Sequence, residues 1–228
     1  MNDAPLIKHL GVAPYEPVWR AMQELTDVRT SSTPDEIWFV EHPAVFTLGM
    51  NASREHLLAP GDIPVLQIDR GGQVTYHGPG QLVVYPLIDL KRRRLGVREL
   101  VVALENAVIS YVGELGVAAQ GSREAPGVYI GAAKLASLGL RIRRGASYHG
   151  LALNVSLDLA PFERINVCGH RGLTVTRLTD HAECLAGLQA SEAMDRVASG
   201  LTPHLLRQLK FGADYSAINT DLQAVNSR

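Results

Sequence analysis

The sequence predicts an α/β fold of the α+β kind, with a mixed, mostly antiparallel sheet flanked by helices. First, 46% of the 228 residues are hydrophobic and 20% are charged, so the chain can bury a core. Second, strand-like and helix-like segments alternate without the regular rhythm of a parallel sheet. Third, no repeat, low-complexity tract or linker divides the chain. We therefore expect one domain over residues 1–228, with a polar, frayed tail at residues 213–228.

The first half of the chain reads as a helix followed by short strands. The helix is expected because Val18, Met22 and Leu25 recur on one helical face. The first two strands are interrupted at His42-Pro43, because the residue before a proline disfavours the helical region. The expected segments are a helix over residues 14–29, two strands within residues 36–50, and strands over residues 65–69 and 81–90.

The second half contains the clearest helix of the sequence, Val97 to Leu115, which Gly116 ends. Its apolar stripe consists of Leu100, Leu104, Val108 and Tyr111, extended by Val97, Val101 and Leu115. Further expected segments are strands over residues 127–130, 134–142 and 147–156 and a helix around residues 190–210.

Composition argues against several classes of protein. The net charge of −1 does not indicate a nucleic-acid partner. The longest apolar runs, such as Leu82–Ile88, are too short to span a membrane, and the first residues lack the pattern of a secretory signal. Only two cysteines are present, so neither a disulfide framework nor a cysteine-rich zinc site is expected. A reducing, cytoplasmic setting follows as the default.

The segment from Arg70 to Gln81 reads RGGQVTYHGPGQ and is the most informative part of the sequence. Its four glycines are interleaved with Arg, Thr, Tyr and His, and an apolar run follows. Glycine allows positive φ and the close approach of another molecule, which favours a ligand cradle. A tight hairpin that needs glycine in its turns explains the same composition equally well.

Cys168 is a candidate nucleophile because Gly169 follows it, which leaves the sulfur approachable and the nearby N–H groups able to face an oxyanion. A lone cysteine is, however, more often a small buried hydrophobe. We interpret Cys184 as a packing residue. Lys134 has small apolar neighbours, which favour a neutral amine. Its spacing alone favours the alternative, a strand-end lysine whose amine reaches water.

His77 and His149 each precede a glycine, where they could donate to a carbonyl, move protons or simply end strands. No histidine lies at ligand spacing from another histidine or a carboxylate, so no metal site is expected. The basic clusters Lys91–Arg94 and Arg141–Arg144 suit a solvated surface or a docking patch for an acidic protein. The common phosphate-loop and serine-hydrolase motifs do not occur.

Three long stretches together resemble the octanoyltransferases of lipoate biosynthesis, also called lipoyl(octanoyl) transferases. They are RGGQVTYHGPGQLVVYPLIDL, APGVYIGAAKLASLGLRIRRGASYHGLALNV and FERINVCG, in the order that the family has them. The likeness runs from about His42 to Leu178. One position departs from the pattern, because Val167 stands where the family usually has a proline before its cysteine.

The resemblance implies an α/β fold like that of biotin and lipoate protein ligases. It also implies transfer of an octanoyl group from acyl carrier protein to Cys168 and then to the lysine amine of a lipoyl domain. The implied acceptors are the lipoyl domains of 2-oxoacid dehydrogenase acyltransferase subunits and the glycine cleavage H protein. A thioester is already activated, so no cofactor is expected. We also expect a monomer that binds neither a membrane nor nucleic acid.

By the same resemblance, Cys168 matches the nucleophile and Lys134 the lysine that assists it. The matching substrate-site residues are Arg70, Gly71, Gly72, Gln73, Val74, Thr75, Tyr76, His77, Ser137, Leu138, Gly139, Gly150, Leu151 and Ala152. We expect Lys134 to alternate between an ammonium beside the thiolate and a neutral base for the incoming amine. Small residues, namely Ala132, Ala136 and Ala152, are expected to line an apolar channel.

Three alternatives remain open at this point. One is an ATP-dependent lipoate or biotin protein ligase of the same fold, which would use a lysine near Lys134 but would not need Cys168. Another is a non-catalytic module that binds acyl carrier protein. The last is a thioester hydrolase, which would release free acid without any lipoyl domain.

Overall fold

The computed structural model of the chain describes residues 4–212. The expected frayed tail, residues 213–228, lies outside the described residues. A seven-stranded sheet has the order β1-β2-β6-β10-β9-β8-β7, and a three-stranded sheet has the order β4-β3-β5. Within the larger sheet only β1 and β2 pair in parallel; the remaining neighbours are antiparallel. The predicted mixed, mostly antiparallel α/β fold is confirmed.

Each predicted segment is present to within a few residues, and the structure adds short elements that were not predicted. The strands of the larger sheet are β1 (Leu6–Val12), β2 (Glu36–Glu41), β6 (Gln81–Leu87), β7 (Gln120–Gly121), β8 (Gly127–Ile130), β9 (Ala133–Arg143) and β10 (Ala146–Asn154). The smaller sheet has β3 (Val45–Leu48), β4 (Val65–Gln67) and β5 (Val74–His77). The helices are α1 (Tyr15–Val28), α2 (Leu90–Arg93), α3 (Val97–Glu114) and α4 (Ala190–Gln208).

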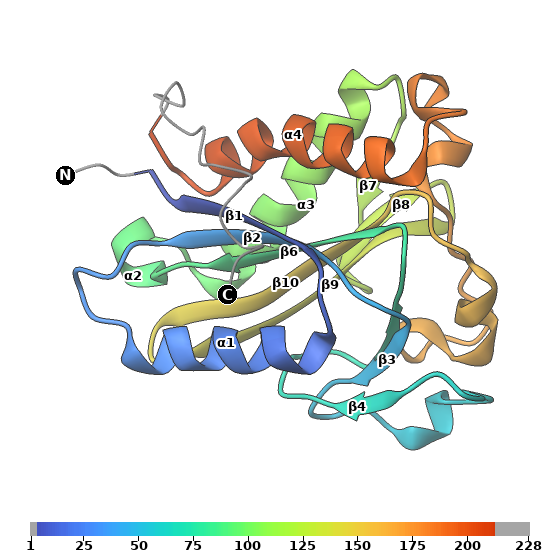
Figure 1. Cartoon of the computed structure of the whole chain (residues 1–228), viewed down its shortest axis with the longest axis horizontal. Coiled ribbons are helices and arrows are strands. Elements are labelled where there is room, and N and C mark those ends of the chain that lie inside the picture. The colour runs from blue at the N-terminus through green and yellow to red at the C-terminus, as the bar shows by residue number, and fades with distance from the viewer. Residues whose placement is uncertain (1–3, 213–228) are drawn as a thin grey trace.

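Helices cover both faces of the larger sheet (Figure 1). On one face α3 and α4 pack against the sheet in the largest apolar cluster, and on the other face α1 packs in a second cluster. Side chains alternate between these faces along β6: Leu82 and Val84 belong to the α3–α4 side, whereas Val83 and Tyr85 belong to the α1 side. A strand covered on both faces is apolar throughout, as the LVVY run is.

Two details of the predicted elements are wrong. Strand β1 was not expected, because it is an edge strand with little burial and therefore gives no clear apolar alternation. Val97 was expected to extend the buried stripe of α3, but it is 51% exposed at the first turn of the helix. Among the described residues, no helix is long and apolar enough to cross a membrane.

The glycine-rich segment contains a closely packed loop and a tight turn. Residues 70–73 form a loop that Gly71 ties to β9 by a 2.9 Å hydrogen bond from its N–H to the carbonyl of Leu140. The loop lies so close to Gly49 that a Cβ there would be 2.1 Å from the carbonyl oxygen of Gly72. The second glycine pair forms the turn between β5 and β6, where Gly80 has φ 85°.

Three arginines of the two basic clusters form ion pairs or hydrogen bonds with carboxylates within the fold. Asp35 is 3% exposed and accepts hydrogen bonds from Arg92 at 2.8 Å and from Arg93 at 3.0 Å. Arg143 forms an ion pair of 3.0 Å with Asp27 of α1. These three arginines therefore pair with carboxylates of the same chain. Docking of an acidic protein on the two clusters stays a prediction.

Candidate active site

Two side chains that are 34 residues apart in the sequence meet at the site. Lys134 Nζ donates a hydrogen bond to Cys168 Sγ, with 3.0 Å between the two atoms. Lys134 lies on β9 and is 1% exposed, so the expectation of an amine that reaches water is wrong. Its backbone N–H and carbonyl bond to Thr174 and Thr176 at 2.9 Å each, and this added segment covers the start of β9. A buried amine in contact with a thiol can exchange a proton with it directly.

Cys168 lies in the one-turn segment η3 (Val167–Gly169) with φ 54° and ψ 21°, in the left-handed region. Side-chain-bearing residues adopt this region rarely, and such positions are frequent at functional sites. Val167 is 2% exposed and packs in an apolar cluster with Phe162 and Ile165. Packing of Val167 thus anchors the turn at the position where the family usually has proline.

The N–H groups that follow Cys168 are used within this turn. Gly169 N–H donates to the carbonyl of Asn166 at 2.9 Å, and His170 N–H donates to the carbonyl of Val167 at 3.0 Å. The expectation that N–H groups near the sulfur face an oxyanion is therefore wrong for these two groups.

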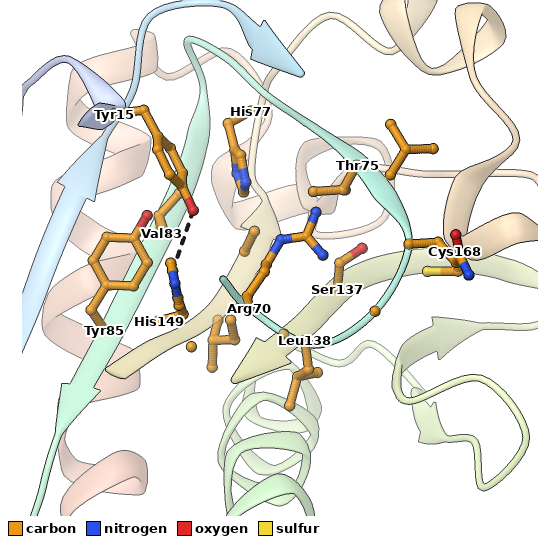
Figure 2. Close-up of a pocket in the computed structure, with 17 residues that line it drawn as sticks. Tyr15, Arg70, Thr75, His77, Val83, Tyr85, Ser137, Leu138, His149 and Cys168 are labelled. Atoms are coloured by element: carbon orange, nitrogen blue, oxygen red, sulfur yellow. Dashed lines mark hydrogen bonds between the residues drawn. The ribbon is translucent and has the colours of Figure 1, made fainter. Parts of the chain in front are cut away.

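An elongated pocket extends from Cys168. Figure 2 shows Cys168 at one end and Tyr15, Tyr85 and His149 at the other, with Arg70 between them. The predicted substrate residues that line it are Arg70, Gly72, Gln73, Val74, Thr75, His77, Ser137, Leu138, Gly139, Gly150, Leu151 and Ala152. A pocket of this shape suits a narrow ligand.

The two remaining predicted substrate residues do not line the pocket. Gly71 instead attaches the loop to β9 through its N–H, as described above. Tyr76 packs on the opposite side of β5, against Phe46 and Phe162, with ring centroids 5.5 Å apart in each pair. Alternation along the strand explains this, because Thr75 and His77 on either side of Tyr76 face the pocket.

The sequence reasoning missed three lining residues, Tyr15, Val83 and Tyr85. Tyr15 begins α1, and the other two lie on the α1 side of β6. No motif marks them; only the packing of α1 across the sheet brings them to the pocket. A useful signal would have been the alternation within LVVY, which places Val83 and Tyr85 on one face.

Asp69 clamps the end of the pocket opposite Cys168. Its carboxylate accepts hydrogen bonds from Trp19 at 2.7 Å, Gln23 at 3.0 Å, His149 at 2.9 Å and the hydroxyl of Tyr148. Burial opposes ionisation of Asp69, but the bonds from His149, Tyr148 and Gln23 outweigh it and hold the carboxyl pKa below its usual range. Residues of α1 and β10 thereby fix the backbone just before Arg70.

His149 is a neutral member of this clamp. Burial lowers the pKa of His149, although the neighbouring Asp69 acts in the opposite direction. The ring nitrogen Nε2 therefore donates to Asp69, and Nδ1 accepts from the hydroxyl of Tyr15 at 3.4 Å, the contact drawn dashed in Figure 2. His149 shapes the pocket end and is not near the sulfur.

Arg70 places a fixed positive charge in the pocket wall. It is 6% exposed, and in the part of the chain that the structure describes no carboxylate is bonded to it. Its guanidinium donates to the carbonyl and hydroxyl oxygens of Thr47 at 2.7 and 2.9 Å and to the carbonyl of Gly71 at 2.9 Å. Burial lowers the pKa of Arg70, but a guanidinium keeps its proton in proteins.

His77 supports Arg70 through Thr47. Burial holds the pKa of His77 well below its usual value, so the ring is neutral. Gln81 uses its amide N–H groups on Asn154 and the carbonyl of Tyr76, so its oxygen accepts from His77 Nδ1 at 2.8 Å. His77 Nε2 then accepts from the hydroxyl of Thr47 at 3.3 Å. The hydrogen bonds of His77 connect it to Thr47 and Gln81 and give it no contact with Cys168.

The geometry thus combines a thiol, a buried amine in contact with it, and an elongated pocket. Among residues 4–212 no group of three or more His, Cys, Asp or Glu side chains is arranged to hold a metal ion. The arrangement suits attack of a thiolate on a carbonyl group, with the amine as the proton donor and acceptor.

Comparison with known proteins identifies the family of the chain. The family model described as the lipoyl protein ligase A/B catalytic domain matches residues 14–202. An octanoyltransferase from Chromohalobacter salexigens is 58% identical over 203 residues, which cover 89% of this chain and 90% of the relative. The chain belongs to the lipoyl protein ligase A/B catalytic domain family. A second octanoyltransferase, from Laribacter hongkongensis, is 56% identical over 203 residues, covering 89% of this chain and 95% of the relative.

Among lipoyl protein ligase A/B catalytic domains, the relatives at this level of identity are octanoyltransferases, so the chain is an acyltransferase. The fold is shared with a solved structure of lipoate-protein ligase A bound with ATP. The TM-score is 0.71 over 91% of this chain and 86% of that chain, at 17% identity. At this identity the likeness shows the fold alone, and it confirms the predicted resemblance to lipoate ligases.

Three smaller expectations about this family member need correction. Cys184, interpreted as a packing residue, is exposed on the short segment η5 (Glu183–Leu185). Ala132 is exposed in the turn before β9 and does not line the pocket. Ala136 belongs to the core on the α3–α4 side, because it alternates with the pocket-lining Ser137, and only Ala152 of the three alanines lines the pocket.

Proposed function

We propose that this acyltransferase moves an octanoyl group from an acyl carrier protein thioester, through Cys168, to the lysine amine of lipoyl domains. The single observation that carries the proposal is the 3.0 Å contact between Lys134 Nζ and Cys168 Sγ at the end of a pocket. The acceptors are the lipoyl domains of 2-oxoacid dehydrogenase acyltransferase subunits and the glycine cleavage H protein. Because a nucleophilic thiol persists in a reducing compartment, we assign the reaction to the cytoplasm.

In the first stage the thiolate of Cys168 attacks the carbonyl carbon of the donor thioester. The new bond joins Sγ to that carbon, and the bond to the carrier sulfur breaks. The departing sulfur takes the proton of the Lys134 ammonium and leaves as a thiol. The stage ends with an octanoyl thioester on Cys168 beside a neutral Lys134 amine.

In the second stage the acceptor amine attacks the same carbonyl carbon. Neutral Lys134 takes the proton that the attacking nitrogen loses, the amide bond forms and the carbon–sulfur bond breaks. Cys168 returns as a thiolate beside the Lys134 ammonium, so one proton shuttles through Lys134 in each cycle. An amine with a pKa near 10.4 is less than about 0.1% neutral at pH 7, and a general base is typically worth ~10²–10⁴-fold.

The pocket supplies binding energy for the acyl chain. Burial of six methylene groups at about 0.8 kcal/mol each offers on the order of 5 kcal/mol. Gly72, with φ 85°, and Ala152 leave room at the wall because they carry little or no side chain. The pocket therefore holds the octanoyl group while Cys168 and Lys134 carry out the transfer.

An ATP-dependent lipoate ligase is the second candidate, because lipoate-protein ligase A bound with ATP shares the fold. Such an enzyme activates a free acid and needs no cysteine next to its lysine, whereas here Cys168 contacts Lys134. One experiment separates the two: the purified protein receives a lipoyl domain with either octanoyl-acyl carrier protein or free octanoate plus ATP. We expect octanoylated domain from the carrier-protein thioester without nucleotide. Product formed only from free acid and ATP would establish the ligase instead.

A further inference from the structure

Glu105 is an acid on the buried face of α3, next to Leu104 in the apolar stripe. It is 8% exposed. A carboxylate is rarely buried in such a position unless a partner compensates the loss of water. Nothing in the reaction described above uses Glu105, and its partners lie in the direction of the active site.

Gly127 is the link between Glu105 and the catalytic lysine. Glu105 Oε1 accepts the N–H of Gly127 at 2.7 Å. Gly127 has φ 152°, and a Cβ there would lie 2.4 Å from Lys134 Cε and 3.1 Å from Lys134 Nζ. The backbone of Gly127 therefore lies directly against the Lys134 amine, and Glu105 holds that backbone from behind.

Three titratable side chains from three elements face Lys134 among the described residues. Cys168 of η3 contacts Nζ at 3.0 Å, the ring of Tyr129 on β8 lies 5.3 Å from Nζ, and Glu105 of α3 acts through its charge. No carboxylate in residues 4–212 forms an ion pair with Lys134. The contacts through Gly127 bring Glu105 Oε1 within about 9 Å of Nζ, since each connecting bond is near 1.5 Å.

The charge of Glu105 favours the ammonium form of the lysine. Burial raises the pKa of Glu105, while the N–H of Gly127 and the positive charge of Lys134 favour its ionised form. Attraction between charges is mutual, so an ionised Glu105 also attracts the Lys134 ammonium. At an effective dielectric constant between about 80 and about 20, a unit charge at this distance moves a titration midpoint by about 0.3 to 1.4 pH units.

We propose that Glu105 is a positioning residue that holds Gly127 against Lys134 and stabilises the ammonium form of that lysine. The inference rests on the proposed function, in which Lys134 must be an ammonium at the start and end of each cycle. Glu105 does not touch substrate; it sets the position and charge of the group that does.

The chain has only four lysines, Lys8, Lys91, Lys134 and Lys210, so the titration of one of them can be followed directly. Full-length protein labelled with ¹³C at lysine Cε is titrated by NMR, and the Lys134 signal is assigned by its absence in Lys134→Met. Glu105→Gln keeps an oxygen for the N–H of Gly127 but removes the charge. We expect the Lys134 titration midpoint to move lower by about 0.3 to 1.4 pH units in this variant.

Glu114→Gln is the matched control, because it removes the same charge from the same helix. Glu114 pairs with His204 at 3.2 Å and is not near Lys134, so this variant should leave the midpoint unchanged. Glu105→Asp keeps the charge and should stay close to wild type. If Glu105→Gln does not fold, Glu105→Asp remains as a second variant. It keeps the charge, so a Lys134 midpoint that moves by a full pH unit in it overturns the inference.

The NMR result does not depend on enzyme activity, so it separates this inference from the proposed function. In the transfer assay the alkaline limb of the rate should move to lower pH in Glu105→Gln by the same amount. An unmoved Lys134 midpoint, or a moved midpoint with an unmoved alkaline limb, overturns the role of Glu105. A wild-type protein that transfers no octanoyl group, but whose Lys134 midpoint moves in Glu105→Gln, overturns the proposed function alone.

Discussion

Replacing Lys134 by methionine decides between two roles of the amine. Methionine keeps most of the buried volume of the lysine stem but can neither donate nor accept a proton. If the amine served only to ionise Cys168, the cost would be small. Lowering a thiol pKa by two units raises its thiolate fraction roughly 25-fold at pH 7. The less basic thiolate is also a weaker nucleophile, and this lowers the rate by nearly tenfold. The net effect of ionisation is thus a few-fold.

General-base assistance is worth far more, typically ~10²–10⁴-fold, or about 3–5 kcal/mol of barrier. Lys134 Nζ lies 3.0 Å from the sulfur to which the acyl group is attached, so it is within reach of an amine that attacks there. We therefore expect Lys134→Met to load octanoyl only a few-fold to tenfold more slowly but to transfer it at least 10²-fold more slowly.

Quenched-flow mass spectrometry measures the two stages separately. Loading is followed as acylated enzyme after mixing with the donor alone, and transfer as octanoylated lipoyl domain after mixing preloaded enzyme with acceptor. Thermal unfolding of the variant checks that the core is intact. The reasoning is refuted if the variant loads slowly but transfers at the wild-type rate.

Three further predictions concern the pocket and its support. Gly72→Val should abolish octanoyl loading without unfolding the protein. Gly72 lines the pocket with φ 85°, and a Cβ there lies 3.4 Å from Arg70 Nη1. Normal loading by this variant would show that the loop does not hold the acyl chain. Thr47→Val should lower the unfolding free energy by about 1–3 kcal/mol and slow loading, because Arg70 and His77 each lose a hydrogen bond to the Thr47 hydroxyl. An unchanged denaturant midpoint would contradict this prediction. The protein should lose stability as pH falls from 6.5 towards about 4, because burial lowers the pKa of His42 to about 4 and only the unfolded chain takes up the proton in that window. The cost from His42 alone is on the order of 3 kcal/mol, and equal urea midpoints at pH 7 and pH 5 would contradict it.

Residues that follow simple periodicities were predictable from the sequence. Leu100, Leu104 and Val108 form a helical stripe, and the structure buries all three in α3. The LVVY run is apolar because helices cover both faces of β6. Strand β1 was missed because an exposed edge strand needs no apolar pattern.

The pairing of Lys134 with Cys168 could not be predicted from spacing. Spacing favoured a lysine in water, because nothing local shows that residues 174–176 add to the start of β9 and bury the amine. The family resemblance supplied the pair, and the structure supplied its distance. Tyr15 and Glu105 were missed for the same reason: each reaches the site from a helix, and only tertiary packing decides which helical residues face it.

The acyl-enzyme on Cys168 is the central claim, and intact-protein mass spectrometry tests it most directly. Protein mixed with octanoyl-acyl carrier protein alone should gain one octanoyl group, located on the peptide that contains Cys168, and should lose it when a lipoyl domain is added. Cys168→Ala should show neither the adduct nor transfer. Octanoylated lipoyl domain formed by Cys168→Ala at the wild-type rate would contradict the account.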